Sequence, residues 1–310
     1  MKTFLVTGGA GFIGSHLVDA LLSAGHAVRV LDDLSTGSVQ NLAPAAEFIE
    51  GNIGDLAVLA KAMAGCDGVF HMAAIASVDK ANKDWLGTHH TNLSGTIAVL
   101  DQARRLDRLP VVLASSAAVY GDGGSNPITE DFPTRPISAY GADKLGCELH
   151  ARVGTSVHGV PAIAFRFFNV YGPRQDPSSP YSGVISIFAS RIAAGQTIVL
   201  HGDGEQIRDF IYVADVVSHL IAGMESLHRE GVQAAGVFNV CTGRSTTIKS
   251  LACLLGEVFG KEVKHEMGPA RAGDIKVSLG SRAKVASRFA LPEPVPLPEG
   301  LKALAAWMCY

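Results

Sequence analysis

The chain has 310 residues, of which 47% are hydrophobic and 18% are charged, and its formal net charge is -3. This composition predicts a well-cored globular protein that is long enough for two domains. Because Lys and Arg form no run, nothing favours nucleic acid as a partner. No run approaches the ~18 apolar residues that would span a membrane, so no membrane partner is expected.

The five cysteines stand far apart, at positions 66, 147, 241, 253 and 309, and form no CxxC pair. An odd number at such spacings makes disulfide bonds and a zinc site unexpected, and we expect no metal. A reducing compartment suits this chain, so we expect it in the cytoplasm.

Residues 3–7 form a short apolar run, typical of a buried strand, and the sequence GGAGFIG at 8–14 follows directly. Apolar residues then recur at helical spacing from Ile13 to Ala24. Strand, glycine turn and helix in this order are typical of a dinucleotide-binding unit. The glycines let backbone N–H groups approach a pyrophosphate, and the helix N-terminus favours its charge.

A second strand over 27–31 leads into Asp32, 18 residues past Gly14. This is near the spacing of an acid that binds the adenosine ribose. A carboxylate bonds the 2′-hydroxyl and repels a 2′-phosphate, so Asp32 predicts NAD rather than NADP. The alternative is that Asp32 only caps a loop.

Strands and helices continue to alternate, with strands expected over 47–50, 68–71 and 109–115 and helices from Asp55 and over 85–106. This rhythm predicts an α/β fold with a Rossmann-type, doubly wound parallel sheet. The ligand should lie beyond the carboxyl ends of the strands. His71 ends one of these strands, and we interpret it as a packed histidine rather than a catalyst.

Two further segments bring polar groups to the same edge of the sheet. The strand that ends at Ser115 delivers Ser115 and Ser116, whose hydroxyls could bond a substrate oxygen or could simply form a turn. Ser138 can cap a helix that places Tyr140 and Lys144 one turn apart on one face. A fixed cation beside a phenol favours the phenolate, although a YxxxK spacing also occurs by chance in surface helices.

Together these segments resemble the extended short-chain dehydrogenase/reductase superfamily, and specifically its nucleotide-sugar epimerases of the UDP-galactose 4-epimerase type. The resemblance covers essentially the whole chain. The matching motifs are TGGAGFIG (7–14), DDLSTG (32–37), HMAA (71–74), NLSGT (92–96), SSAAVYG (115–121), YGADK (140–144), FRFFNVYGPR (165–174), RDFIYVADV (208–216) and RAGD (271–274).

The resemblance implies a catalytic triad. Tyr140 would be the general base, Lys144 would lower its pKa and bind the nicotinamide ribose, and Ser116 would steady the sugar O4. Ser116 is chosen because it stands three residues before Val119, where the family carries its catalytic Ser or Thr. The implied reaction oxidises C4 of a UDP-sugar with NAD, lets the 4-keto sugar turn in the site, and returns the hydride to its other face.

The same resemblance implies the binding residues. Guanidinium groups match phosphate geometry, although Arg208 with Asp209 and Arg271 with Asp274 could instead form surface ion pairs. Asn52 stands where many relatives have an Asp that faces the adenine amine, and its carbonyl can accept the same bond. The residues expected to bind NAD are Gly8, Gly11, Phe12, Ile13, Gly14, Asp32, Asp33, Ser35, Thr36, Gly37, Asn52, Ile53, Ala73, Ala74, Asn92, Tyr140 and Lys144, and those expected to bind the UDP-sugar are Ser116, Tyr140, Asn169, Arg208, Arg271, Asp274 and Ser278.

Ser278 and the pair after Ser116 carry the expected specificity. Relatives restricted to glucose and galactose tend to have a tyrosine at the position of Ser278, so a serine predicts UDP-GlcNAc and UDP-GalNAc as substrates, with UDP-glucose and UDP-galactose also accepted. The alternative, a nucleotide-sugar 4,6-dehydratase, would need an acid pair where Ala117 and Ala118 stand. A non-enzymatic NAD-binding protein is disfavoured because the whole triad is present.

We expect two domains. Residues 1–170 would bind NAD, and residues 171–310 would bind the nucleotide sugar, with 209–240 returning to the first domain. The helices expected over 85–106 and 138–157 match those that pair two subunits in relatives, so we expect a homodimer. The same apolar stripes could instead be core within one chain.

Overall fold

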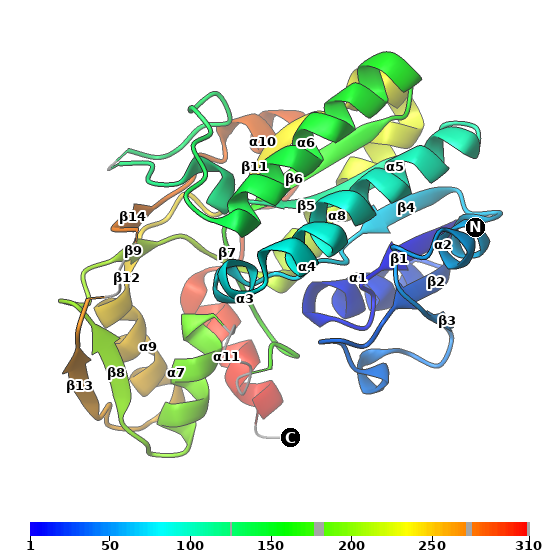
Figure 1. Ribbon diagram of the computed structural model, residues 1–310. Coiled ribbons are helices and arrows are strands. Elements are labelled where there is room, and N and C mark those ends of the chain that lie inside the picture. The colour runs from blue at the N-terminus through cyan, green and yellow to red at the C-terminus, as the bar shows by residue number, and fades with distance from the viewer. Residues whose placement is uncertain (125, 177–182, 271–274, 309–310) are drawn as a thin grey trace.

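The structure is a computed structural model that describes residues 1–124, 126–176, 183–270 and 275–308 (Figure 1). Its main sheet has seven strands in the order β11-β6-β5-β4-β1-β2-β3, all of them parallel to their neighbours. The Rossmann-type fold class is therefore confirmed. The strands are β1 (Thr3–Thr7), β2 (Ala27–Asp32), β3 (Glu47–Glu50), β4 (Gly68–His71), β5 (Val111–Ser116), β6 (Ala162–Phe167) and β11 (Gly236–Val240).

Helices cover both faces of this sheet, which explains why its central strands are almost continuously apolar. Helices α1 (Phe12–Ser23) and α8 (Val213–Glu230) pack together against one face, and their core includes Phe4, Val30 and Phe165. Helices α2 (Leu56–Met63), α5 (Gly95–Arg105) and α6 (Ala139–His158) cover the other face. The order of the strands reverses between β1 and β4, so the carboxyl ends of these two strands border the crevice in which such sheets bind ligands.

The helix expected over 85–106 is continuous but not uniform. It comprises α4 (Trp85–His89), a π-helical turn η2 (His90–Ser94) and α5. A π turn inserts an extra residue into the hydrogen-bond ladder, and such turns often occur at functional sites. This one carries Asn92, which is buried.

A smaller lobe lies beside the sheet, at the lower left of Figure 1. Its core joins α7 (Val184–Ala193), α9 (Ile248–Phe259) and α11 (Leu297–Met308), with β8 (Ile198–His201) paired to β13 (His265–Gly268). Short strands occupy the region between the lobe and the sheet: β7 (Asn169–Tyr171) pairs with β10 (Phe210–Tyr212), and β9 (Ile207–Arg208) lies between β12 (Thr246–Thr247) and β14 (Val277–Ser278).

The chain returns from the smaller lobe to the large sheet. Helix α8 packs on that sheet and strand β11 forms its edge. Val285 and Phe289, on and beside α10 (Ala283–Arg288), join the same core, a second return that the sequence analysis did not anticipate. The remaining elements are α3 (Val78–Lys83) and the 3₁₀ turns η1 (Val39–Asn41), η3 (Ala117–Tyr120) and η4 (Gly231–Ala234). None of the helices in the described ranges combines the length and apolar character needed to cross a membrane.

Candidate active site

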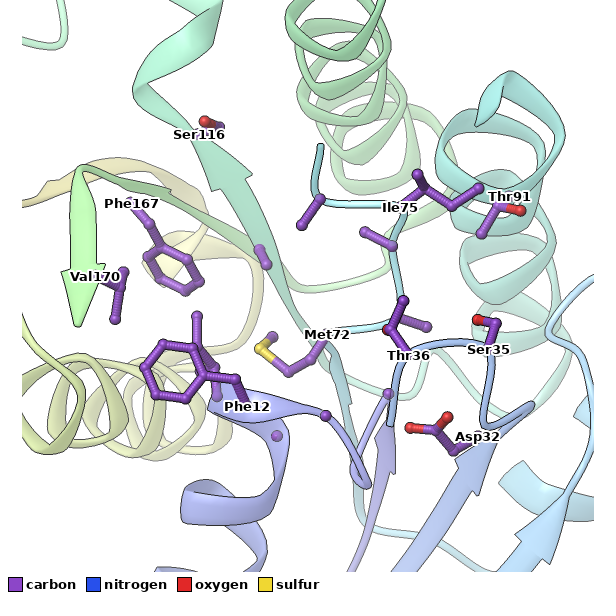
Figure 2. Close-up of a pocket in the computed structure, with 18 of the residues that line it drawn as sticks. Phe12, Asp32, Ser35, Thr36, Met72, Ile75, Thr91, Ser116, Phe167 and Val170 are labelled. Atoms are coloured by element: carbon purple, nitrogen blue, oxygen red, sulfur yellow. The ribbon is translucent and has the colours of Figure 1, made fainter. Parts of the chain in front are cut away.

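A cavity of about 490 Å³ lies at the carboxyl ends of the central strands (Figure 2). In this view Asp32, Ser35 and Thr36 lie to the right, Met72 lies near the centre, Phe12 and Phe167 lie on the left, and Ser116 lies at the upper left. The predicted residues that line the cavity are Gly8, Gly11, Phe12, Ile13, Gly14, Asp32, Asp33, Ser35, Thr36, Asn52, Ile53, Ala73, Ala74, Ser116, Tyr140, Lys144 and Asn169.

The glycine turn between β1 and α1 allows only glycine at its tightest points. Gly8 has φ +68°, and a Cβ there would lie 2.6 Å from the Ala73 nitrogen. A Cβ on Gly14 would lie 2.1 Å from the Gly8 carbonyl oxygen. Gly11 precedes α1, and no side chain caps that helix. The free N–H groups of its first turn therefore suit a pyrophosphate in the adjoining cavity.

Asp32 is held by the loops on either side of it. Its Oδ2 accepts a hydrogen bond from the Ala10 N–H and its Oδ1 accepts one from the Leu34 N–H, both at 2.9 Å. Burial raises the pKa of this carboxyl, and the two backbone bonds oppose that shift. Each oxygen keeps a second lone pair, so Asp32 can still accept a bond from a ribose hydroxyl.

Asp33 and Asn52 form a pair at the same end of the cavity. The Asn52 amide donates to Asp33 Oδ2 at 2.9 Å, and the Asn52 carbonyl accepts from the Gly54 N–H at 2.8 Å. An aspartate in place of Asn52 would set two carboxylates against each other. The asparagine is therefore compatible with Asp33, and one lone pair of its carbonyl remains for an adenine amine.

The three residues of the predicted triad line the same cavity. Ser138 caps α6 by accepting from the Gly141 N–H at 3.1 Å, as expected, and this starts the helix that carries Tyr140 and Lys144. Lys144 is buried, donates to the Ala114 carbonyl at 2.9 Å, and has its Nζ 5.9 Å from the centre of the Tyr140 ring. Ser116, at the end of β5, lies on the wall of the same cavity. A cation, a phenol and a hydroxyl at one site suit a proton transfer.

A second cavity, of about 410 Å³, adjoins the first through Asn169, which lines both. Arg191, His201 and Arg208 are among its wall residues, and all belong to the smaller lobe or to the strands beside it. The Arg208 guanidinium donates to the Ile207 and Ile275 carbonyls. Positive side chains in a cavity next to the triad suit a diphosphate.

Comparison with known proteins agrees with this geometry. A sequence profile of the NAD dependent epimerase/dehydratase family matches residues 4–241. The chain is 35% identical over 306 residues to the putative UDP-glucose 4-epimerase of Methanocaldococcus jannaschii, and the match covers 98% of this chain and 97% of that protein. The chain belongs to the NAD-dependent epimerase/dehydratase family.

Two solved structures of similar proteins share the whole fold. A UDP-N-acetylglucosamine 4-epimerase from Methanobrevibacter ruminantium, in complex with UDP-N-acetylmuramic acid, has a TM-score of 0.94 at 36% identity, with 99% of this chain and 98% of that chain covered. The UDP-glucose 4-epimerase of Thermus thermophilus, in complex with NAD, has a TM-score of 0.91 at 33% identity, with 99% of both chains covered. The cofactor of this epimerase/dehydratase family member is NAD.

His71, Thr96 and Asn92 form a chain of hydrogen bonds next to the loop after β4. Thr7 Oγ1 lies 2.8 Å from His71 Nδ1, and His71 Nε2 lies 3.0 Å from Thr96 Oγ1, which donates to the Asn92 carbonyl. Burial and, to a lesser extent, the charge of Lys144 lower the pKa of His71 to about 3. The interpretation of His71 as a packed histidine is therefore confirmed.

Two residues expected to bind NAD contact the protein instead of lining the cavity. The Asn92 side chain accepts from the Ile75 N–H at 2.8 Å and donates to the Ile75 carbonyl at 3.2 Å, so it holds a loop whose residues line the cavity. Gly37 packs on the glycine turn, because a Cβ there would lie 2.9 Å from the Ala10 carbonyl carbon. Direct contact of either residue with NAD stays a prediction.

The predicted UDP-sugar residues are only partly placed. Asn169 and Arg208 line the second cavity, whereas Ser278 is paired with Arg208 in the β14–β9 register and is not among the described wall residues. Arg271 and Asp274 lie outside the described residues. Asp209 is fully buried, and its carboxylate accepts from Thr242 and from the Gly243 N–H, so it is a structural acceptor.

Sequence reasoning missed several wall residues. Phe167 is the last residue of β6 and Val170 lies three residues beyond it, where the strand-end rule could have found them. Lys80 and Thr91 lie on helices, and no local motif marked them. The wall residues that the sequence analysis did not name as binding residues include Met72, Ile75, Lys80, Thr91, Phe167, Val170, Gln175, Arg191 and His201.

Proposed function

We propose that this chain is an NAD-dependent UDP-sugar 4-epimerase that acts through a 4-keto sugar. One observation carries the proposal: the cavity that holds Ser116, Tyr140 and Lys144 together with the glycine turn adjoins, through Asn169, a second cavity with two arginines. The similarity to two epimerases, one solved with a UDP-sugar and one with NAD, supports it.

We assign each residue a role that suits its position. Bound NAD supplies the acceptor and then the donor of the hydride at sugar C4. Tyr140 takes the proton from O4 and later returns it, and the buried Lys144 lies beside its ring. Ser116 donates a hydrogen bond to O4 as charge develops there. Arg208 and Arg191 neutralise the diphosphate and hold the nucleotide while the sugar turns.

A panel of four sugars tests the activity. The protein with NAD is incubated separately with UDP-glucose, UDP-galactose, UDP-GlcNAc and UDP-GalNAc, and the products are separated. We expect each pair to interconvert. No 4-keto-6-deoxy sugar should form, because the methyl groups of Ala117 and Ala118 cannot exchange protons. Absence of turnover on all four sugars would reject the proposal, and loss of water from a UDP-sugar would indicate a dehydratase.

We further propose that the acetylated pair is accepted because Ser278 is small. Ser278 is the register partner of Arg208, so the two side chains lie on the same face of this small sheet. Ser278→Tyr should abolish turnover of UDP-GlcNAc and spare UDP-glucose, since a clash excludes a group more strongly than the ~1–3 kcal/mol that an empty space forgoes. Ser287→Tyr, at an exposed position on α10, is the matched control. Equal effects of Ser278→Tyr on both pairs would show that Ser278 is not the gate.

We also propose that the protein is a homodimer that pairs through α5 and α6. Leu149, Val153 and Val157 recur one turn apart on α6 and are 46%, 45% and 69% exposed, and Ile97 on the neighbouring α5 is 36% exposed. A contiguous apolar row on two packed helices is typical of a protein interface. A second copy would bury the same row against its own counterpart, as two-fold symmetry allows.

A further inference from the structure

A buried polar cluster lies behind the catalytic residues. Ser115, which directly precedes Ser116, donates from its Oγ to Glu148 Oε1 at 2.5 Å. Glu148 lies on α6, one turn after Lys144, and Lys144 donates to the carbonyl of Ala114. Two successive turns of α6 are therefore bonded to the two residues of β5 that lead into Ser116.

The carboxylate of Glu148 has a fixed orientation. Arg166, on β6, binds it with both branches of its guanidinium, Nε to Oε1 at 2.9 Å and Nη2 to Oε2 at 2.7 Å. The two side chains are only 6% and 4% exposed. The remaining guanidinium nitrogen, Nη1, donates to the Tyr120 hydroxyl at 2.7 Å, and this hydroxyl in turn donates to Asn239 Oδ1. A forked pair of this kind cannot swing without losing both bonds.

This arrangement does more than fill the core. A buried ion pair is poor evidence of stabilisation, because well-packed apolar residues often serve as well. Here Glu148 is hydrogen-bonded to the residue before Ser116, and it lies on α6, the helix that also carries Tyr140 and Lys144. Ser116 lies on the strand and the other two lie on the helix, so any slip between β5 and α6 changes the geometry of the triad.

We propose that Glu148 is a positioning residue for the reaction: held by Arg166, it ties Ser115 to α6 and so sets the separation of Ser116 from Tyr140 and Lys144. The inference rests on the epimerase activity proposed above. The other titratable groups around Lys144 are Asp143 and Cys147 on α6 and His71 on β4. Burial raises the pKa of Cys147 and lowers that of His71, so both are neutral at pH 7.

Ser115→Ala is the sharpest test, because it removes the tie and leaves the Glu148–Arg166 pair intact. Glu148→Ala would instead leave the buried Arg166 charge without its carboxylate partner. In Ser115→Ala we expect kcat to fall about 10-fold with little change in KM, which is less than the ~10²-fold that a 1 Å misplacement can cost.

Two further variants separate positioning from stability. Ser115→Thr keeps the hydroxyl and should restore most of kcat. Ser226→Ala removes the hydroxyl of a different buried serine, far along α8, which accepts a hydrogen bond from Arg288 at 2.6 Å, and it should leave kcat and KM unchanged. An active wild-type enzyme whose kcat survives Ser115→Ala would overturn this inference alone, whereas an inactive wild type would overturn the proposed function.

Discussion

Tyr140 is the residue on which the proposed chemistry depends most. Its hydroxyl is the only part of the side chain that can exchange a proton, whereas the aromatic ring packs near Lys144. Tyr140→Phe keeps the ring and removes the oxygen, so turnover should fall by about 10²- to 10⁴-fold while bound NAD is retained. Steady-state rates and the cofactor released on denaturation measure the two effects. Retention of more than half of the activity would exclude Tyr140 as the base.

His71 should make the stability of the fold depend on pH. Its pKa is about 3 in the folded chain against 6.5 for an unperturbed histidine, because burial disfavours the charged ring. The unfolded chain binds more protons between these two values, so stability rises with pH across this window. Below pH 6.5 the free energy of unfolding should therefore fall by about 1.4 kcal/mol per pH unit on account of His71.

Urea unfolding of wild type and His71→Gln at pH 7, 6 and 5 isolates this contribution. Burial also lowers the pKa values of His16, His219 and His228, so both proteins should lose some stability in acid. The wild type should lose more, because the amide of the variant does not titrate. Parallel curves for the two proteins would contradict the assignment.

Among the elements, the β1–α1 turn leaves no room for a side chain at Gly14. A methyl group on Gly14 would meet the Gly8 carbonyl oxygen at 2.1 Å and the Gly9 Cα at 2.8 Å, and both belong to the backbone. Gly14→Ala must therefore displace the turn from the start of α1. We expect the Kd for NAD to rise at least about 10-fold, a loss of ~1.4 kcal/mol, in an equilibrium binding assay.

Gly154→Ala is the matched control for this turn. Gly154 lies on α6, and the nearest atoms to an added Cβ are 3.8 and 3.9 Å away. A helical Gly→Ala change gains up to about 1 kcal/mol of helix propensity, so stability should hold or rise and NAD binding should not change. Equal binding by both variants would show that the glycine turn tolerates a side chain.

At the scale of the whole molecule, the apolar row on α5 and α6 predicts the assembly state. Leu149→Glu with Val153→Glu places two like charges on each copy of the row, so the proposed dimer should dissociate. Sedimentation at several concentrations measures the change. Val232→Glu, at a 38% exposed position in η4, is the control and should leave the dimer intact. A wild type that sediments as a monomer would reject the proposed interface.

The sequence alone predicted the features whose geometry is local. The glycine turn, the Ser138 cap and the one-turn spacing of Tyr140 and Lys144 depend on residues within a few positions of each other, and turn and helix geometry sets their arrangement. The strand alternation likewise predicted the parallel sheet, since its hydrophobic runs must be buried on both faces. Asp32 followed from its distance to the glycines along the chain.

Only the tertiary structure decided which partners the remaining groups meet. It directs Ser115 to Glu148, turns Asn92 toward the Ile75 loop, and brings Asn169 and Arg208 together in a second cavity. It also leaves Leu149 and Val153 exposed, although their spacing would fit a buried face equally well. Apolar residues at helical spacing indicate that one face of a helix is apolar. The surface that covers this face depends on packing between segments far apart in the chain.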